Sequence, residues 1–247
     1  MTHPHLSIVV PVKDEEDNIR PLVDACRDAL GDLYARCELV FVDDGSTDGS
    51  LTSMQAVASG DPHVRWLQFE RNCGQSAALD AGFRAARGDL VAMIDADLQN
   101  DPADLPAMVE LLRTGQCDCV CGIRQKRQDS WVRKVSSKIG NGTRNWLTHE
   151  SITDVGCSIR VFRRELLDGL KMFRGMHRFL PTLLRLEGAR IREIPVRHHP
   201  RTRGKTKYGI GNRLFRGLRD IFAVRWMQSH HMRYHIKAQS SPPDAET

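Results

Sequence analysis

Long apolar runs are missing from this sequence of 247 residues, although 40% of the residues are hydrophobic. No stretch approaches the roughly 18 to 20 continuous apolar residues that a helix needs to span a bilayer. The first residues also lack the basic leader of a secretory signal, and their apolar run ends at Lys13 and Asp14. We therefore expect a cytoplasmic protein with enough residues for one sizeable α/β core.

Aromatic residues make up only 6% of the chain, and none of them form a cluster typical of an RNA-stacking surface. The basic residues that crowd residues 197–225 nevertheless predict an anionic partner. A nonenzymatic module that binds nucleic acid or membrane is therefore one alternative. The acid-rich loops of the first half argue against it, because they would repel phosphate without a metal, and we expect no nucleic-acid partner.

Glycine is absent from the loop after the first apolar run, KDEEDN. A Rossmann dehydrogenase needs glycines there for close approach to a pyrophosphate, so this class is disfavoured. A second cysteine pair at metal-binding spacing is also absent, although the chain has seven cysteines. Cys117, Cys119 and Cys121 alternate, which on a strand would place all three on one face. Buried reduced thiols are favoured over a zinc site.

Short apolar runs alternate with helical patterns through the first half. Strands are expected at 6–12, 38–44, 64–69, 89–97 and 117–122, with helices at 18–30 and 76–86 among the connections. This alternation predicts an α/β fold with a mostly parallel sheet flanked by helices. Ligands bind beyond the carboxyl ends of such strands. The loops expected there are all polar: KDEEDN, DDGSTDGS, RNCGQS and DADLQND.

The second half is less regular. A basic helix is expected over 130–148, strands over 155–162 and 189–198, and a basic loop over 199–209. Residues 209–228 carry apolar and basic residues at helical spacing. This pattern fits a helix on an anionic membrane surface and equally an ordinary packed helix. We expect one domain over 1–208, followed over 209–247 by this helix and a polar, disordered tail.

Two pairs of acids stand where ligand chemistry is expected. Asp95 and Asp97 follow the fourth strand, and with Gln99 they share one side of an extended chain. Such hard oxygen ligands suit Mg²⁺ or Mn²⁺, which could neutralise a leaving diphosphate, although the pair could instead cap the next helix. Asp43 and Asp44 could accept hydrogen bonds from a base or ribose. The alternative is that Asp44, Ser46 and Asp48 instead form the hydrogen bonds of a turn and a helix N-cap.

Five ordered segments resemble glycosyltransferase family 2: PVKDEEDNI, VDDGSTDGS, RNCGQSAALDAGF, GDLVAMIDADLQNDP and RQDSWVRKVSSK. The similarity runs from about Leu6 to Tyr208 and is nearest to the polyprenyl-phosphate branch, which includes dolichol-phosphate mannose synthase. The stretch GIRQKRQDSWVRKVSSK is most similar to undecaprenyl-phosphate 4-deoxy-4-formamido-L-arabinose transferase. The resemblance implies a GT-A fold and an inverting, metal-dependent transfer from a UDP- or GDP-sugar to a polyprenyl phosphate. A saccharide or other non-lipid acceptor is the alternative.

The resemblance also assigns roles residue by residue. It implies that the nucleoside pocket is lined by Pro11, Glu15, Asp43, Asp44 and Arg71. The metal, Mg²⁺ or Mn²⁺, and the diphosphate would be held by Asp95, Asp97 and Gln99. The acceptor phosphate would be bound by Arg124, Arg133 and Ser137. Arg201 and Lys207 would close over the donor phosphates, and Asp154 matches an acid near the transfer site.

Cations suit this chemistry, because a polyprenyl phosphate is already an anion and the task is to bring two anions together.

The chain departs from the family pattern in three respects. Lys13 and Asp14 replace an aromatic residue and Asn, Thr206 replaces Ser, and two transmembrane helices found in many bacterial relatives are missing. We therefore expect contact with the inner face of the cell membrane through the helix at 209–228 or through a membrane partner subunit.

Overall fold

The computed structural model describes residues 3–125, 152–200 and 213–232. In this part of the chain a seven-stranded sheet has the order β3-β2-β1-β4-β6-β5-β7. The strands are β1 (Leu6–Val12), β2 (Cys37–Asp43), β3 (Val64–Gln68), β4 (Leu90–Met93), β5 (Cys119–Arg124), β6 (Arg160–Arg163) and β7 (Ile191–Val196). The helices are α1 (Ile19–Leu30), α2 (Ser50–Gly60), α3 (Gln75–Ala85), α4 (Leu105–Arg113), α6 (Leu180–Leu186) and α7 (Arg213–His230).

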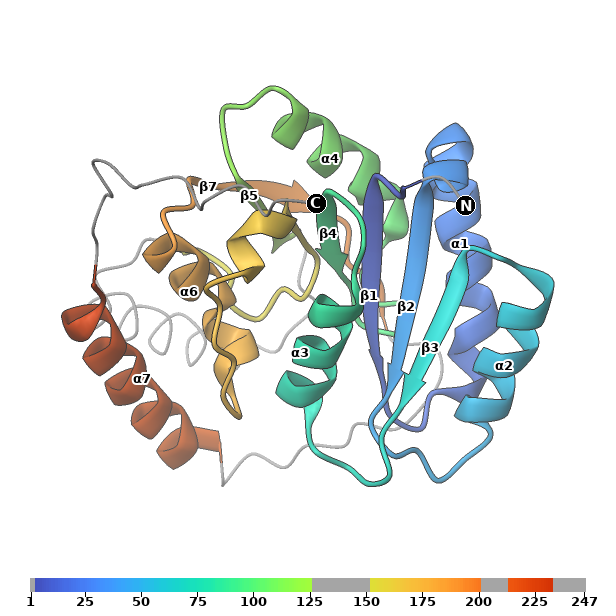
Figure 1. Ribbon diagram of the computed structural model, residues 1–247, viewed down its shortest axis with the longest axis horizontal. Helices are drawn as coiled ribbons and strands as arrows, with labels where there is room; N and C mark the ends of the chain where they lie inside the picture. The colour runs from blue at the N-terminus through green and yellow to red at the C-terminus, as the bar shows by residue number, and fades with distance from the viewer. Residues whose placement is uncertain (1–2, 126–151, 201–212, 233–247) are drawn as a thin grey trace, which may run out of the picture.

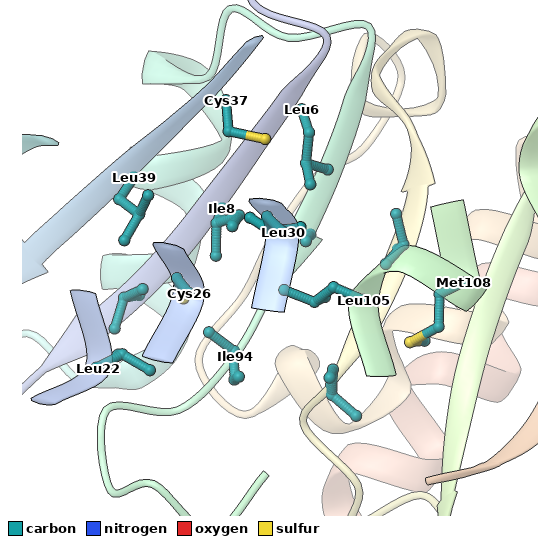
Figure 2. Close-up of a cluster of buried hydrophobic side chains, with 14 of the residues drawn as sticks. Leu6, Ile8, Leu22, Cys26, Leu30, Cys37, Leu39, Ile94, Leu105 and Met108 are labelled. Carbon is teal, nitrogen blue, oxygen red and sulfur yellow. The ribbon is translucent and has the colours of Figure 1, made fainter. Parts of the chain in front are cut away.

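Helices cover both faces of the sheet (Figure 1). On one face, Ile8 and Leu39 of the strands pack with Cys26 of α1 and with Leu105 and Met108 of α4 (Figure 2). On the other face, residues of α3, α6 and α7 form a second cluster against β1, β4 and β5. Because β1 and β2 are buried on both faces, they need the continuous apolar runs that the sequence shows.

Strand directions bring most of the polar loops to one edge. β1 is parallel to β2 and β4, and β2 is parallel to β3. β6 runs antiparallel to both β4 and β5, while β5 is parallel to β7. The carboxyl ends of every strand except β6 therefore share one edge of the sheet, and β6 begins there. The predicted mostly parallel sheet is confirmed.

Two predicted strands are shorter than expected. β4 ends at Met93, and the chain then turns at Ala96 and Asp97, with Leu98 in the left-handed region at φ 58°. The extended alternation expected to align Asp95, Asp97 and Gln99 therefore does not position them. β6 begins only at Arg160, because residues 155–159 form a turn and an irregular segment instead of a strand.

The three alternating cysteines do not share a face, so that prediction is wrong. Cys119 and Cys121 lie on β5 with their sulfur atoms 3.8 Å apart, in the cluster that includes α3. Cys117 precedes the strand and packs in the opposite cluster with α4. All three thiols are free and buried, as the preferred interpretation had it.

Helix α7 has two different sides. Ile221 and Val224 are buried in the cluster with α3 and α6, which agrees with a packed helix. Phe222 and Trp226 are 65% and 63% exposed, and Arg225 is exposed as well. Ile221 is buried and its neighbour Phe222 is exposed, so they lie on different sides of the helix. Within the described ranges, no helix combines the length and apolar character needed to cross a membrane.

Candidate functional site

The loops after β1, β2 and β3 are joined at the carboxyl edge. Lys13 Nζ donates to the Gly45 carbonyl at 2.6 Å, and Asp14 Oδ1 accepts from the Thr47 amide at 2.8 Å. A Cβ on Gly45 would lie 2.6 Å from the Arg71 carbonyl carbon, so the second and third loops are in close contact. Lys13 and Asp14, which depart from the family pattern, thus hold two loops together.

The rest of the first loop is fixed in the same way. The Glu15 amide donates to Ser50 Oγ at 2.8 Å, and the Glu15 carboxylate accepts from Asn18 Nδ2 at 2.6 Å. Glu16 Oε2 accepts from the Gly49 amide at 2.6 Å. Pro11, on β1, is half-buried beside this loop. These contacts fix the loop before any ligand binds, which lowers the entropic cost of forming a pocket.

Asp43 is the last residue of β2 and is fully buried. Its Oδ1 accepts from the Ser46 amide at 2.9 Å, so it does take part in turn chemistry. Its Oδ2 is buried and has no hydrogen-bond partner among the described residues. A buried carboxylate oxygen without a donor is costly, so this atom is suited to an N–H or O–H of a bound molecule.

The Asp44 carboxylate holds the loop that follows β3. Its Oδ1 accepts from the Cys73 amide at 2.6 Å, and its Oδ2 accepts from the Gly74 amide at 2.9 Å. Both carboxylate oxygens thereby hold the loop that leads into α3. The N-terminal turn of α2 is served by Asp48, whose Oδ1 accepts from the Ser50 amide at 3.0 Å. Arg71 is exposed on the loop that Asp44 fixes.

Asp95 and Asp97 lie beyond the end of β4, at the same edge. Asp95 Oδ1 accepts from Gln75 Nε2, at the start of α3, at 2.9 Å. Asp97 is 8% exposed, and its Oδ1 accepts from the Gln99 amide at 3.1 Å. The following 3₁₀ turn (Pro102–Asp104) is capped by Asp101, which accepts from the Ala103 amide. The alternative that Asp95 and Asp97 cap this turn is therefore wrong.

The donor set formed by Asp95, Asp97 and Gln99 fits a hard divalent cation, because all three offer oxygen atoms. The Gln99 side-chain nitrogen Nε2 donates to the His199 carbonyl at 3.4 Å, so the side-chain oxygen Oε1 is the atom that Gln99 can offer to a metal. In the portion of the chain described, no group of three or more His, Cys, Asp or Glu residues could hold a metal. The predicted set has only two carboxylates and would rely on Gln99 or on ligand oxygens.

Arg124 and Asp154 are brought together where β5 ends. The guanidinium donates through Nε to Oδ2 and through Nη2 to Oδ1, both at 2.8 Å. Asp154 is 6% exposed, and its neighbour Thr153 is held by Glu193 of β7 at 2.9 Å. A Cβ on Gly156 would lie 2.6 Å from Arg124 Nη2, so a side chain there would displace the guanidinium. The sequence identified both members of the pair but not the contact between them.

A buried polar network behind the site was not predicted. Ser76 Oγ accepts from the Gly175 amide at 2.9 Å and lies 2.7 Å from His177 Nδ1. The direction of this second hydrogen bond depends on the His177 tautomer, and His177 is neutral near pH 7. Burial, with help from Arg178 and Arg160, lowers the pKa of His177 to about 3.

Arg160 extends this network to the loop that carries Asp154. It is 2% exposed and begins β6, opposite Met93 of β4. It donates to the His177 carbonyl at 3.0 Å and to the Val155 carbonyl at 2.9 Å. The arginine thereby connects the start of α3, beside Asp95, with the turn that follows Asp154. The only sequence signal was a charged residue inside the apolar run CSIRVF.

Several predicted site residues cannot be placed. Arg133, Ser137, Arg201 and Lys207 lie outside the described residues, as do the predicted helix over 130–148, Thr206 and the boundary at 208. The residues that the structure does bring to one edge are Pro11, Glu15, Asp43, Asp44, Arg71, Asp95, Asp97, Gln99, Arg124 and Asp154.

Comparisons with known proteins place the chain in a family. It is 38% identical over 232 residues to dodecaprenyl-phosphate galacturonate synthase of Rhizobium johnstonii, covering 92% of this chain and 68% of that protein. It is 38% identical over 207 residues to undecaprenyl-phosphate 4-deoxy-4-formamido-L-arabinose transferase of Aeromonas hydrophila, covering 83% of this chain and 63% of that protein. The chain thus spans about two thirds of the length of these relatives.

Solved structures share the fold. Glucosyl-3-phosphoglycerate synthase from Mycobacterium tuberculosis, in complex with Mn²⁺ and uridine-diphosphate-glucose, matches with a TM-score of 0.66 and 24% identity over 91% of this chain and 79% of that one. This likeness confirms the GT-A fold. The model named "Glycosyl transferase family 2" matches residues 7–170, and the chain therefore belongs to this family.

Proposed function

We propose that this chain transfers a sugar from a nucleotide sugar to a polyprenyl phosphate at a membrane surface. The observation that carries the proposal is the unsatisfied, fully buried Oδ2 of Asp43, at the same sheet edge as Asp95 and Asp97. An N–H of a uracil or guanine base would satisfy that oxygen. The names of the two relatives, both polyprenyl-phosphate sugar transferases, support the choice of acceptor.

On the donor side, the fixed loops provide the nucleoside pocket. Asp43 would accept from the base, with Pro11, Glu15 and Arg71 around it, while Asp44 keeps the third loop in place. Asp95, Asp97 and Gln99 would hold Mg²⁺ or Mn²⁺. When bound, such a cation would neutralise the negative charge that develops on the leaving diphosphate. The hydrogen bond from Gln75 fixes the orientation of Asp95 for this purpose.

On the acceptor side, a phosphate oxygen of the lipid would form a bond to the anomeric carbon while that carbon's bond to the diphosphate oxygen breaks. The lipid phosphate is already ionised near pH 7, so the reaction needs no strong base. Asp154 is consistent with this, because a carboxylate held at two points by a guanidinium is a poor proton acceptor. We assign Asp154 the task of orienting Arg124 towards the anionic acceptor, together with Arg133 and Ser137.

The outer side of α7 suits contact with a membrane. Phe222 and Trp226 are one helical turn apart and exposed, and Arg219 and Arg225 are exposed beside them. Aromatic side chains enter the interface of a bilayer, and each arginine is attracted to anionic lipid by about 1 kcal/mol. We place the protein at the inner face of the cell membrane, where α7 brings the carboxyl edge to its lipid substrate.

The test is nucleoside diphosphate release from a panel of UDP- and GDP-sugars with Mn²⁺, with and without undecaprenyl phosphate. We expect release to depend on the lipid phosphate, and a soluble saccharide that replaced it fully would favour the non-lipid alternative. For α7, co-sedimentation with anionic vesicles should fall for a Phe222→Ser/Trp226→Ser double variant. Phe173→Ser, an exposed phenylalanine elsewhere in the sequence, is the matched control.

A further inference from the structure

A second recess lies at the opposite edge of the sheet. Its volume is about 780 Å³, within the size range of sites for small molecules. Its walls come from the first residues of β2 and β3, from the segment before β1, and from the residues that follow α3 and β6. Figure 1 shows the chain's N-terminus and the starts of β1 and β2 at this edge. None of the proposed nucleotide-site residues lines it.

Positive charge dominates the lining. A single carboxylate, Glu38, faces four arginines: Arg36, Arg65, Arg87 and Arg164. Burial would raise the pKa of Glu38, but hydrogen bonds from Ser7, Arg65 and the Arg87 amide hold that pKa below its ordinary value. Glu38 is therefore ionised, and Arg65, at 2.6 Å, balances its charge. The recess keeps three arginines for which Glu38 provides no counter-charge.

These three arginines, Arg36, Arg87 and Arg164, have exposed side chains. Within residues 3–125, 152–200 and 213–232, no hydrogen bond or ion pair of their guanidinium groups is found. Asp89, next to the segment before β1, is bound to His3 at 2.9 Å. Burial raises the pKa of the Cys37 thiol to about 12, so this lining residue adds no negative charge to the recess. Three cations at one recess favour a multiply charged anion.

We propose that this recess binds a small molecule that carries two or more phosphate groups and has about the size of a nucleotide. Guanidinium groups bind phosphate oxygens at two points, and Arg36, Arg87 and Arg164 offer such contacts from three separate segments. The volume exceeds what one phosphate fills, and the buried Cys37 and Ala86 in the lining suit an organic portion. The site is distinct from the carboxyl edge and needs no metal.

Isothermal titration calorimetry of the whole chain with tripolyphosphate and with ATP, in EDTA and at low salt, tests the proposal. We expect wild type to bind both. An Arg87→Ala/Arg164→Ala variant should bind at least about tenfold more weakly, since it loses two charge-assisted contacts to phosphate. Arg113→Ala, which removes an exposed arginine of α4 outside the recess, is the matched control. Arg164→Ala alone serves if the double variant does not fold.

The gain in UDP affinity that Mn²⁺ gives reports separately on the carboxyl edge, because the recess needs no metal, and this gain should be unchanged in the double variant. Equal tripolyphosphate affinity in wild type and in the double variant would overturn the proposal, and so would absence of binding by wild type. A parallel loss in Arg113→Ala would also overturn it, because the binding would then reflect general surface charge. If wild type binds tripolyphosphate but Mn²⁺ gives no gain in UDP affinity, the proposed function fails while this site stands.

Discussion

Arg124 and Asp154 form a two-point ion pair, with Nε to Oδ2 and Nη2 to Oδ1 both at 2.8 Å. The pair joins the end of β5 to a turn that lies 30 residues later in the sequence. A planar guanidinium can make this contact and an ammonium cannot. In the proposed function, Arg124 is therefore positioned before the acceptor phosphate arrives.

The first prediction concerns this geometry. Arg124→Lys keeps the charge but loses the second contact, so we expect kcat to fall at least about tenfold with little change in donor KM. Steady-state kinetics with separate variation of lipid and nucleotide sugar measure this split. Arg113→Lys, an exposed arginine of α4, is the control. Full activity of Arg124→Lys would show that the two-point contact has no role in the transfer.

The second prediction concerns Asp43. Asp43→Asn keeps an acceptor for the Ser46 amide but removes the charge, and it can present an NH₂ group where the buried Oδ2 lies. We expect nucleotide affinity to fall by about tenfold or more, because a donor would face the base N–H. Calorimetry with UDP and with GDP measures the loss, and thermal unfolding checks that the fold survives. Unchanged affinity for both nucleotides would remove Asp43 from the base site.

The third prediction concerns metal dependence. Asp97→Asn should abolish the gain in UDP affinity that Mn²⁺ gives wild type, because a neutral amide is a weaker ligand for a hard cation. Asp101→Asn is the control, since Asp101 caps the next turn instead. Thermal shift with UDP, titrated with Mn²⁺ and then with EDTA, reads out binding without turnover. An Mn²⁺ effect that survives in Asp97→Asn would move the metal elsewhere.

The sequence predicted the carboxyl edge of the sheet better than the contacts behind it. β1 and β2 are seven-residue strands with mostly apolar residues, and each is followed by an acid-rich loop, so the local pattern predicted both the strands and their polar ends. Alternation failed beyond Met93 and before Cys119, because parity holds only while the backbone stays extended. For this reason the extended geometry predicted for Asp95, Asp97 and Gln99 is absent, and Cys117 does not share a face with Cys121.

A local sequence pattern could not predict the contacts between segments that are distant in the sequence. Ser76 and His177 are 101 residues apart, and only the packing of α3 against the 3₁₀ helix Met176–Phe179 brings them together. Among the described residues no carboxylate pairs with Arg160, whose hydrogen bonds go to the carbonyls of His177 and Val155. A single sequence records none of these pairings, since each depends on how the whole sheet is assembled.

The last prediction follows from the neutral state of His177. Its pKa falls from an ordinary value of 6.5 to about 3 in the folded chain, chiefly because it is buried. Between these values the unfolded chain binds a proton at His177 that the folded chain does not. The free energy of unfolding should therefore decrease as pH falls from 6.5 towards 3, by up to about 1.4 kcal/mol per pH unit from this group.

His177→Gln should make that pH dependence shallower, because glutamine does not titrate. Urea unfolding at several values from pH 8 to pH 4.5 measures it for wild type and variant. The difference at pH 8 reports the cost of altered packing and of the lost hydrogen bond to Ser76, which is 2.7 Å in length. The change in slope below pH 6.5 reports titration alone, so destabilisation by poor packing cannot imitate it. Identical slopes in the two proteins would mean that His177 has the same pKa in the folded and the unfolded chain, against the effect expected from its burial.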